Sequence, residues 1–294
     1  RTSFSLRKDV VVQQCIKAMW PVEDFNKMKP ALSDGGYEVS FRKVTGQPND
    51  LRAKIDAGAP AQIPYTGDLG IKLVDVRDGK ATMEDFIAQF SDEDLAVIAF
   101  GEGMNSPKVT GGTGCAFGGL SESLLKKGVP IACGTDGPSG LRMDCGAKGT
   151  SMPNGTMLAC TFDTALVEQV YTKVGEEMVS RRTDVLLAPG MNIHRNPLCG
   201  RNFEYFSEDP LLTGKMAVAI VRGVQSTGLS ACPKHFACNN QETNRLRNDS
   251  ILSERALREI YLKGFRICVT ESSPKNIMTS YNKINGVWGH YHFD

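Results

Sequence analysis

The sequence predicts an α/β protein in which a strand–helix unit is repeated, and three observations support this fold class. A short apolar run at residues 185–188 is followed by a proline and a glycine, which is typical of a strand buried on both faces. Similar runs begin near Val129, Leu229 and Asn276, roughly 45 to 55 residues apart, with helical patterns between them. Polar residues follow each run at its carboxyl end. This arrangement predicts successive βα units that form a parallel sheet.

Residues 1–75 have a different pattern, which predicts the end of a small β-rich domain and a linker. Residues 36–44 alternate between apolar and polar side chains and follow the turn sequence Asp34-Gly35-Gly36. Residues 71–76 alternate again, which predicts a second strand. Nothing catalytic is visible in this part of the chain.

From Thr82 onwards the pattern is helical. Thr82 and Asp85, and then Ser91 and Asp94, have the spacing of capping boxes at helix starts. The glycine-rich residues 111–119 lack the glycine spacing of nucleotide-binding motifs, so we expect a flexible loop there.

Three longer helices are expected between the predicted strands. The first begins at about Asp163, the second has Asp209 as its N-cap and Pro210 at its first position, and Ser253 caps the third. Apolar residues four apart predict the buried stripe of the first helix: Leu166, Val170, Val174 and Met178.

The polar loops at the carboxyl ends of the strands favour a (β/α)₈ barrel, which builds its active site there. A doubly wound open sheet would place polar groups similarly, but no glycine fingerprint for a nucleotide is present. Only four of the eight units are visible, so residues 76–294 are expected to form the first half of a barrel.

The composition excludes some classes of protein. A net charge of +1 gives no reason to expect a nucleic acid partner, and no apolar run approaches the ~20 residues of a membrane span. The nine cysteines form no CxxC pair, which indicates small buried residues in a reducing, cytoplasmic compartment. The first residue is Arg1 and no signal peptide is visible, so we expect a piece of a longer chain.

Six polar residues follow the predicted strands and are expected to converge at one edge of the sheet. Lys234 and His235 are the strongest candidates, because they close an apolar strand where burial is costly unless the groups are used. The set suits the many hydroxyls of a sugar. A lysine at this position equally suits a Schiff-base lyase, so both chemistries stay open on the residues alone. The six are Asp136, Arg142, Arg201, Lys234, His235 and Tyr281.

Other ionisable residues have simpler explanations. Asp209 and Glu208 suit the start of a helix, where the dipole favours negative charge. Glu204 is expected to pair with an arginine or with Lys234 rather than to act as a catalytic carboxylate. His290 and His292 share one strand face, but two ligands without a third are a weak indication of a metal site.

Four long motifs occur in order between Thr82 and Asp294: TDGPSGLR at 135–142, LAPGMNIHRNPLCGRNFEYFSEDP at 187–210, KHFACNNQETNR at 234–245 and MTSYNKINGVWG at 278–289. Together they resemble glycoside hydrolase family 3, the β-glucosidase type. The resemblance implies that Asp136 holds two sugar hydroxyls in the subsite where the bond is cleaved. Tyr281 would lie beside the nucleophile, with Met278 close by. The neighbours of Asp136 in that subsite would be Arg142, Arg201, Lys234 and His235.

The resemblance also implies a reaction. Terminal non-reducing β-D-glucosyl residues would be hydrolysed by retaining double displacement, using two carboxyl groups about 5–5.5 Å apart. No metal or cofactor would be needed, the partners would be small β-glucosides or oligosaccharides, and assembly into a homo-oligomer stays open. A β-xylosidase or other β-glycosidase of the family is the alternative. KHFACNN at 234–240 differs from the KHFPGHG usual in the bacterial N-acetylglucosaminidase branch, which argues against that branch.

Two departures from the family pattern concern the catalytic carboxylates. The family nucleophile is an Asp in an SDW- or TDW-like motif beyond the SYNKING segment, so it is expected after Asp294. The sequence DGGYEVSF at 34–41 resembles the end of a fibronectin-III-like domain. That order is similar to family members in which the barrel comes last, and the acid/base residue would then lie before Arg1.

Overall fold

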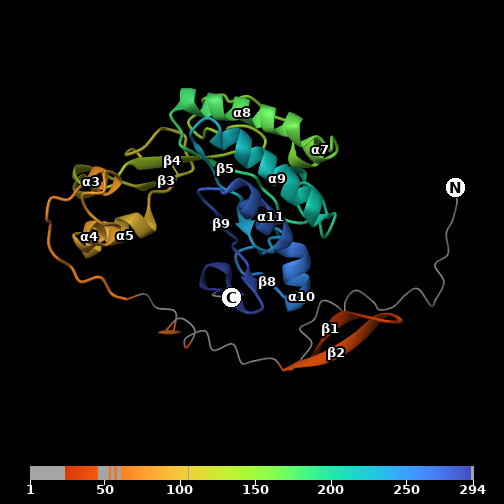
Figure 1. Cartoon of the computed structure of the whole chain (residues 1–294). Coiled ribbons are helices and arrows are strands. Elements are labelled where there is room, and N and C mark those ends of the chain that lie inside the picture. Colours follow the sequence, from red (N-terminus) through yellow and green to blue (C-terminus); the bar gives the residue numbers. More distant parts are fainter. Residues whose placement is uncertain (1–23, 46–52, 54–55, 58–60, 105, 293–294) are drawn as a thin grey trace.

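The central feature of the fold is a four-stranded sheet, seen in a computed structural model that describes residues 24–45, 53, 56–57, 61–104 and 106–292 (Figure 1). Its strands are β3 (Cys115–Gly118), β4 (Ile131–Asp136), β5 (Val185–Leu187) and β6 (Ser230–Ala231), in that spatial order. β4, β5 and β6 are parallel, as predicted, whereas β3 runs antiparallel to β4.

The parallel arrangement continues into a second pair of strands. β7 (Lys234–Phe236) pairs in parallel with β9 (Met278–Thr279), and a parallel bridge joins Gly190, just after β5, to Lys234. A small separate sheet contains β8 (Asp249–Ser250), β10 (Lys283–Ile284) and β11 (Val287–Trp288). The carboxyl ends of β4 and β5 therefore lie close to β7.

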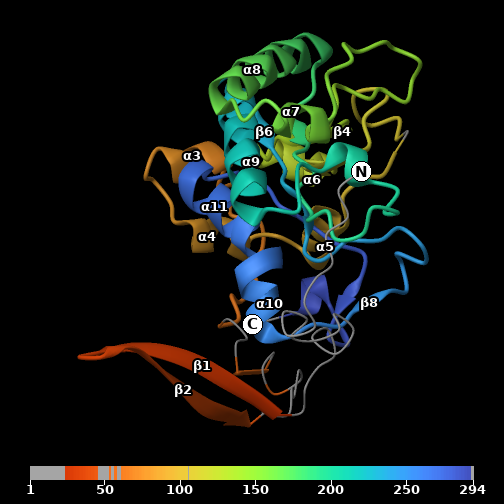
Figure 2. The same cartoon turned by 90° about the vertical axis from the view of Figure 1, so that its right-hand side faces the viewer.

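Three long helices cover one face of the sheet, and α9 lies between α8 and α11 in both views (Figures 1 and 2). α8 (Thr164–Arg181) has Asp163 as its N-cap. α9 (Pro210–Gln225) begins with Asp209 as N-cap and proline at its first position. α10 (Glu254–Ala256), capped by Ser253, leads through a π-helical turn at Leu257–Tyr261 into α11 (Lys263–Ser272). All three predicted helix starts are confirmed.

The buried face of α8 differs from the predicted stripe. Leu166 is 44% exposed, because residues four apart drift around a helix of 3.6 residues per turn. The buried side chains instead alternate between spacings of four and three: Val167, Tyr171, Val174 and Met178.

Strand β5 is buried on both faces, as its continuous apolar run predicts. Leu186 packs with residues of α8 and α9 in the largest core cluster, which includes Met178 and Ile220. Val185 and Leu187 point to the opposite face, where they pack with Cys232. Burial of each such aliphatic side chain stabilises the folded state by roughly 1.5–3 kcal/mol.

The prediction of a strand at residues 71–76 is wrong. These residues contain helix α3 (Leu73–Arg77), and the Asp75 carboxylate accepts a hydrogen bond of 2.9 Å from the backbone N–H of Lys72. Ile71, Leu73 and Val76 pack on the core cluster of Phe86, Phe90 and Leu124. Leu73 and Val76 are three residues apart, a spacing that also suits one face of a helix. Because α3 spans Leu73–Arg77, it crosses the domain boundary that was predicted at residue 75.

The predicted capping residues Thr82 and Ser91 do begin helices, namely α4 (Met83–Ala88) and α5 (Asp92–Phe100). The glycine-rich segment is not simply a flexible loop, because it contains β3. A Cβ on Gly119 would lie 2.0 Å from the carbonyl oxygen of Val129, so the absence of a side chain lets the two segments approach. Two further short helices flank β4: α6 (Glu122–Lys126) and α7 (Gly155–Ala159).

The N-terminal described segment is an antiparallel hairpin of β1 (Asp24–Ser33) and β2 (Gly36–Thr45). The strand predicted at residues 36–44 is thus confirmed, while residues 1–23 lie outside the described part of the chain. Within residues 24–292 as described, no helix combines the length and the apolar character that crossing a membrane requires.

Candidate functional site

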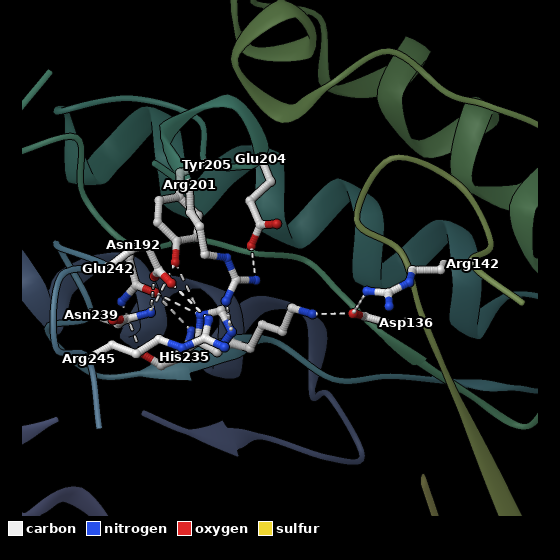
Figure 3. Close-up of polar contacts among 11 residues, drawn as sticks. Asp136, Arg142, Asn192, Arg201, Glu204, Tyr205, His235, Asn239, Glu242 and Arg245 are labelled. Carbon is white, nitrogen blue, oxygen red and sulfur yellow. Dashed lines mark hydrogen bonds and ion pairs between the residues drawn. The ribbon is translucent and has the colours of Figure 1, made fainter. Parts of the chain in front are cut away.

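Side chains from the ends of three strands meet at one edge of the sheet (Figure 3). β4 ends at Asp136, the long segment after β5 provides Asn192, Arg201 and Glu204, and β7 begins with Lys234. A short 3₁₀ helix at Asn202–Glu204 holds the far end of the β5 segment. The carboxyl ends of β4 and β5 thus supply part of the site, as predicted, whereas Lys234 and His235 begin β7 instead of closing the apolar strand β6.

Asp136 is the centre of a group of charges. Its Oδ1 lies 2.6 Å from Lys234 Nζ, and its Oδ2 lies 3.6 Å from Arg142 Nη1. The Lys234 side chain is 3% exposed, whereas that of Asp136 is 33% exposed and accessible to a ligand. Burial acts to raise the pKa of Asp136, but the Lys234 ammonium, with help from Arg142, outweighs it and holds that pKa below its usual range.

Arg201 links a second carboxylate to a histidine. Its guanidinium donates to Glu204 and also, over 3.0 Å, to His235 Nε2. Glu204 is nearly fully buried, and this burial raises its pKa even though Arg201 and Lys234 oppose the shift. Glu204 therefore pairs with an arginine, as expected.

His235 is surrounded by hydrogen-bonding groups. The Asn192 side chain contacts its backbone on both sides, at 3.0 Å from N–H and 2.9 Å from the carbonyl oxygen. Its Nδ1 lies 3.3 Å from Asn192 Oδ1 and 3.2 Å from the Tyr205 hydroxyl. Burial, followed by the positive charges of Arg201, Lys234 and Arg245, lowers the pKa of His235 to about 2. The ring is therefore neutral at ordinary pH.

A further polar chain connects this group to Tyr281. Asn239 donates to the Tyr205 hydroxyl over 3.4 Å and to Glu242 over 3.2 Å. Glu242 forms a 2.8 Å ion pair with Arg245, whose guanidinium lies 4.9 Å from the centre of the Tyr281 ring. Tyr281 itself is 48% exposed.

The structure brings the predicted residues together in one region, although not all of them touch. Asp136 contacts Arg142 and Lys234, while Arg201 contacts His235. Tyr281 contacts Arg245, at the end of the polar chain just described. Met278 pairs in register with Lys234 and packs against the cluster of Val185, Leu187 and Cys232.

Four residues of the site were not among the sequence candidates: Asn192, Tyr205, Asn239 and Glu242. Asn192 could have been found, since a buried amide directly after an apolar strand requires partners. Tyr205 resembles an ordinary core aromatic, and only its hydroxyl contact distinguishes it. Asn239 donates a hydrogen bond to Glu242, and this contact cannot be inferred from the sequence alone.

The histidines near the C-terminus do not gain a third ligand. Throughout the described residues, no group of three or more histidine, cysteine or acidic side chains is arranged to hold a metal ion.

Comparisons with known proteins identify the family of the chain. Residues 96–292 match the family described as glycosyl hydrolase family 3 N terminal domain. The chain is 50% identical over 293 residues to a β-glucosidase of Ruminococcus albus, which covers 99% of this chain. It spans only 30% of the length of that relative.

Solved structures give the same picture. A β-glucosidase from Paenibacillus barengoltzii is 54% identical, with a TM-score of 0.81 over 92% of this chain and 30% of the other. The β-glucosidase 3B of Thermotoga neapolitana, solved in complex with glucose, is 44% identical, with a TM-score of 0.65 over 70% of this chain and 30% of the other. The family match at residues 96–292 includes the strands and loops that build the site.

Proposed function

Because the chain belongs to glycosyl hydrolase family 3, we propose that it supplies the sugar-binding subsite of a β-glucosidase. The whole enzyme would hydrolyse terminal, non-reducing β-D-glucosyl residues of small β-glucosides or oligosaccharides. The observation that carries this proposal is the group around Asp136, in which a partly exposed carboxylate lies between Lys234 and Arg142 at the ends of parallel strands.

The chemistry of this group suits a sugar ring. An ionised carboxylate has two oxygens that only accept hydrogen bonds, so Asp136 can bind two adjacent hydroxyls. Lys234 and Arg142 only donate, and they can bind the lone pairs of the same hydroxyls. Arg201 would extend this surface from the segment after β5, with the buried His235 as its hydrogen-bond partner. Met278 and Tyr281 would line the side nearest the nucleophile.

We further propose a retaining mechanism, in which one carboxylate forms a glycosyl-enzyme and a second carboxyl group protonates the leaving oxygen. Neither role is given to a residue of this chain. In this proposal residues 76–294 are the first half of a (β/α)₈ barrel and the hairpin of β1 and β2 ends a fibronectin-III-like domain. The eight described cysteines are unpaired, which supports a reducing, cytoplasmic compartment.

Two alternatives differ in their chemistry. A β-xylosidase would use the same subsite with a pentose. A Schiff-base lyase would need the Lys234 amine free to attack a carbonyl carbon, but Lys234 Nζ lies 2.6 Å from Asp136 Oδ1 and the lysine side chain is only 3% exposed.

The proposal is tested by assaying the purified enzyme with p-nitrophenyl β-glucoside and β-xyloside. We expect the higher kcat/KM with the glucoside and, by NMR, β-glucose as the first product released. Preferred cleavage of the xyloside would select the alternative within the family. Trapping of an adduct on Lys234 by borohydride, without glycoside cleavage, would select the lyase.

A further inference from the structure

We propose that Asn192 is a positioning residue. It holds the His235 ring in one tautomer and one orientation, so that His235 Nε2 accepts a hydrogen bond from the Arg201 guanidinium. The inference rests on the proposed function, because its readout is glycoside hydrolysis. Asn192 touches the histidine and not the region around Asp136, so it acts through His235.

The orientation of the Asn192 amide is fixed by the backbone. The N–H of His235 can only donate, so the atom 3.0 Å from it is the amide oxygen. The carbonyl of His235 can only accept, so the atom 2.9 Å from it is the amide nitrogen. Asn192 and His235 are 2% and 3% exposed, so water does not compete for these bonds.

The tautomer of His235 follows from its partners on the opposite side. A guanidinium has no acceptor, so Arg201 must donate to Nε2, which therefore carries no proton in the neutral ring. The proton is then on Nδ1, where Asn192 Oδ1 and the Tyr205 hydroxyl lie within 3.3 Å and 3.2 Å. Asn192 and Arg201 thus require the same tautomer from opposite edges of the ring.

Glu204 completes the arrangement from the arginine side. Its carboxylate accepts from the Nη2 of Arg201, the guanidinium nitrogen that is not used by His235. A Cβ on Gly190 would lie 3.0 Å from Glu204 Oε1 and 3.2 Å from the Tyr205 ring, so the glycine leaves room for both. The result is a continuous chain from Glu204 through Arg201 and His235 to Asn192 (Figure 3).

The charges facing the ring explain why an amide suits this position. Arg201, Lys234 and Arg245 surround His235 with positive charge, and Tyr205 adds a neutral hydroxyl. The carboxylates nearby, Glu204 and Glu242, are each paired with one of the arginines. A carboxylate in place of the Asn192 amide would favour an imidazolium, whose Nε2–H would point at Arg201.

The first test compares Asn192→Asp and Asn192→Ala in the full-length enzyme. We expect Asn192→Asp to lower kcat/KM for p-nitrophenyl β-glucoside about tenfold or more at pH 7. It should also add an ionisation to the acid side of the pH profile, because His235 becomes able to bind a proton. Asn192→Ala should lower kcat/KM without the new ionisation.

Asn196→Ala is the control, because Asn196 lies on the same segment and its side chain accepts only from the backbone of Leu198. It should retain wild-type activity. If the wild-type enzyme hydrolyses no glucoside, the proposed function fails. If the wild type is active and both Asn192 variants retain its kcat/KM and pH profile, the positioning role fails.

A second measurement needs no Asn192 variant. In wild-type enzyme labelled with ¹⁵N-histidine, the His235 signals, assigned with His235→Gln, should report a protonated Nδ1 and a bare Nε2 from pH 5 to 8. A proton on Nε2 in this range would overturn the proposal, whatever the folding of the variants.

Discussion

At the residue scale, three cations of the site are each paired with a carboxylate: Lys234 with Asp136, Arg201 with Glu204 and Arg245 with Glu242. Buried charge is costly unless it is paired, so the pairs allow a densely charged surface at the end of an apolar strand. Of the three carboxylates Asp136 is the most exposed. It is therefore the one best placed to exchange its protein partners for sugar hydroxyls.

Replacing Asp136 tests this role directly. Charge-assisted hydrogen bonds to two hydroxyls are worth roughly 1.5–3 kcal/mol each, so Asp136→Ala should lower kcat/KM several hundredfold or more while the circular dichroism spectrum is unchanged. Asp163→Ala, which removes only the N-cap hydrogen bond to the Leu166 N–H at the start of α8, should cost about 1 kcal/mol of stability and leave kcat/KM unchanged. If Asp136→Ala lowers kcat/KM less than tenfold, Asp136 does not bind the sugar and serves only to form the turn after β4.

Because His235 is buried and neutral, we predict that it makes the free energy of unfolding decrease as the pH falls. Its folded pKa is lowered to about 2, so below an unfolded-state pKa of about 6.5 only the unfolded chain binds the proton. The contribution of His235 is complete above pH 6.5 and is lost as the pH falls, by up to about 1.4 kcal/mol per pH unit.

Urea unfolding between pH 7 and pH 4.5 should therefore show a shallower loss of stability in His235→Gln than in the wild type. His194→Gln is the control, because His194 is a histidine that is only partly buried and whose Nε2 lies 2.8 Å from the carbonyl oxygen of Asn202. Equal slopes in His235→Gln and the wild type would mean that His235 binds protons as readily in the folded state as in the unfolded chain.

Much of the site was predictable from single residues, and the remainder depended on partners. Lys234 and His235 stand out because a strand that begins apolar ends in two ionisable groups. Asp209 and Glu204 were also predicted correctly, as an N-cap and as the partner of an arginine. The roles of Asn192 and Tyr205 depend on contacts with His235, which lies 43 and 30 residues further along the chain.

At the scale of the elements, helix starts were predicted well and helix faces less well. Asp163, Asp209 and Ser253 are caps with a local chemical reason, which the sequence displays within a few residues. The antiparallel β3 and helix α3 depend on tertiary pairing: β3 on β4, and α3 on Phe86. Short elements of four or five residues carry too little periodicity to outweigh such contacts.

The packing of α8 on α9 gives the prediction at this scale. A Cβ on Gly223 of α9 would lie 2.4 Å from the carbonyl oxygen of Glu168 in α8, so Gly223→Ala must separate the helix backbones. We expect a loss of roughly 1–3 kcal/mol in the free energy of unfolding, measured by urea. Gly264→Ala is the control, because its nearest neighbour would be 3.4 Å away and alanine favours a helix by about 1 kcal/mol. Equal stability in the two variants would contradict the close crossing.

At the scale of the whole molecule, both buried or partly buried carboxylates of the central group are paired with cations, Asp136 with Lys234 and Glu204 with Arg201. Glu204 also fits a catalytic pattern. A buried carboxyl group with a raised pKa, near a carboxylate with a lowered pKa such as Asp136, is typical of a general acid paired with a nucleophile. The contact of Glu204 with Arg201 and its burial behind the site favour the structural role. Retaining hydrolysis needs two carboxyl groups on either side of the scissile bond, and Asp136 and Glu204 both face cations of their own.

We therefore expect residues 1–294, expressed by themselves, to show no turnover of p-nitrophenyl β-glucoside. Without a nucleophile no glycosyl-enzyme forms, and without an acid the leaving oxygen stays unprotonated. The assay should be run beside Glu204→Gln, which keeps the side-chain shape while removing the acid. Turnover well above background in the wild-type segment that disappears in Glu204→Gln would make Glu204 a catalytic carboxylate. The assignment of Asp136, Lys234 and Arg201 to sugar binding alone would then be wrong, because the reaction would be centred on the pair of Asp136 and Glu204.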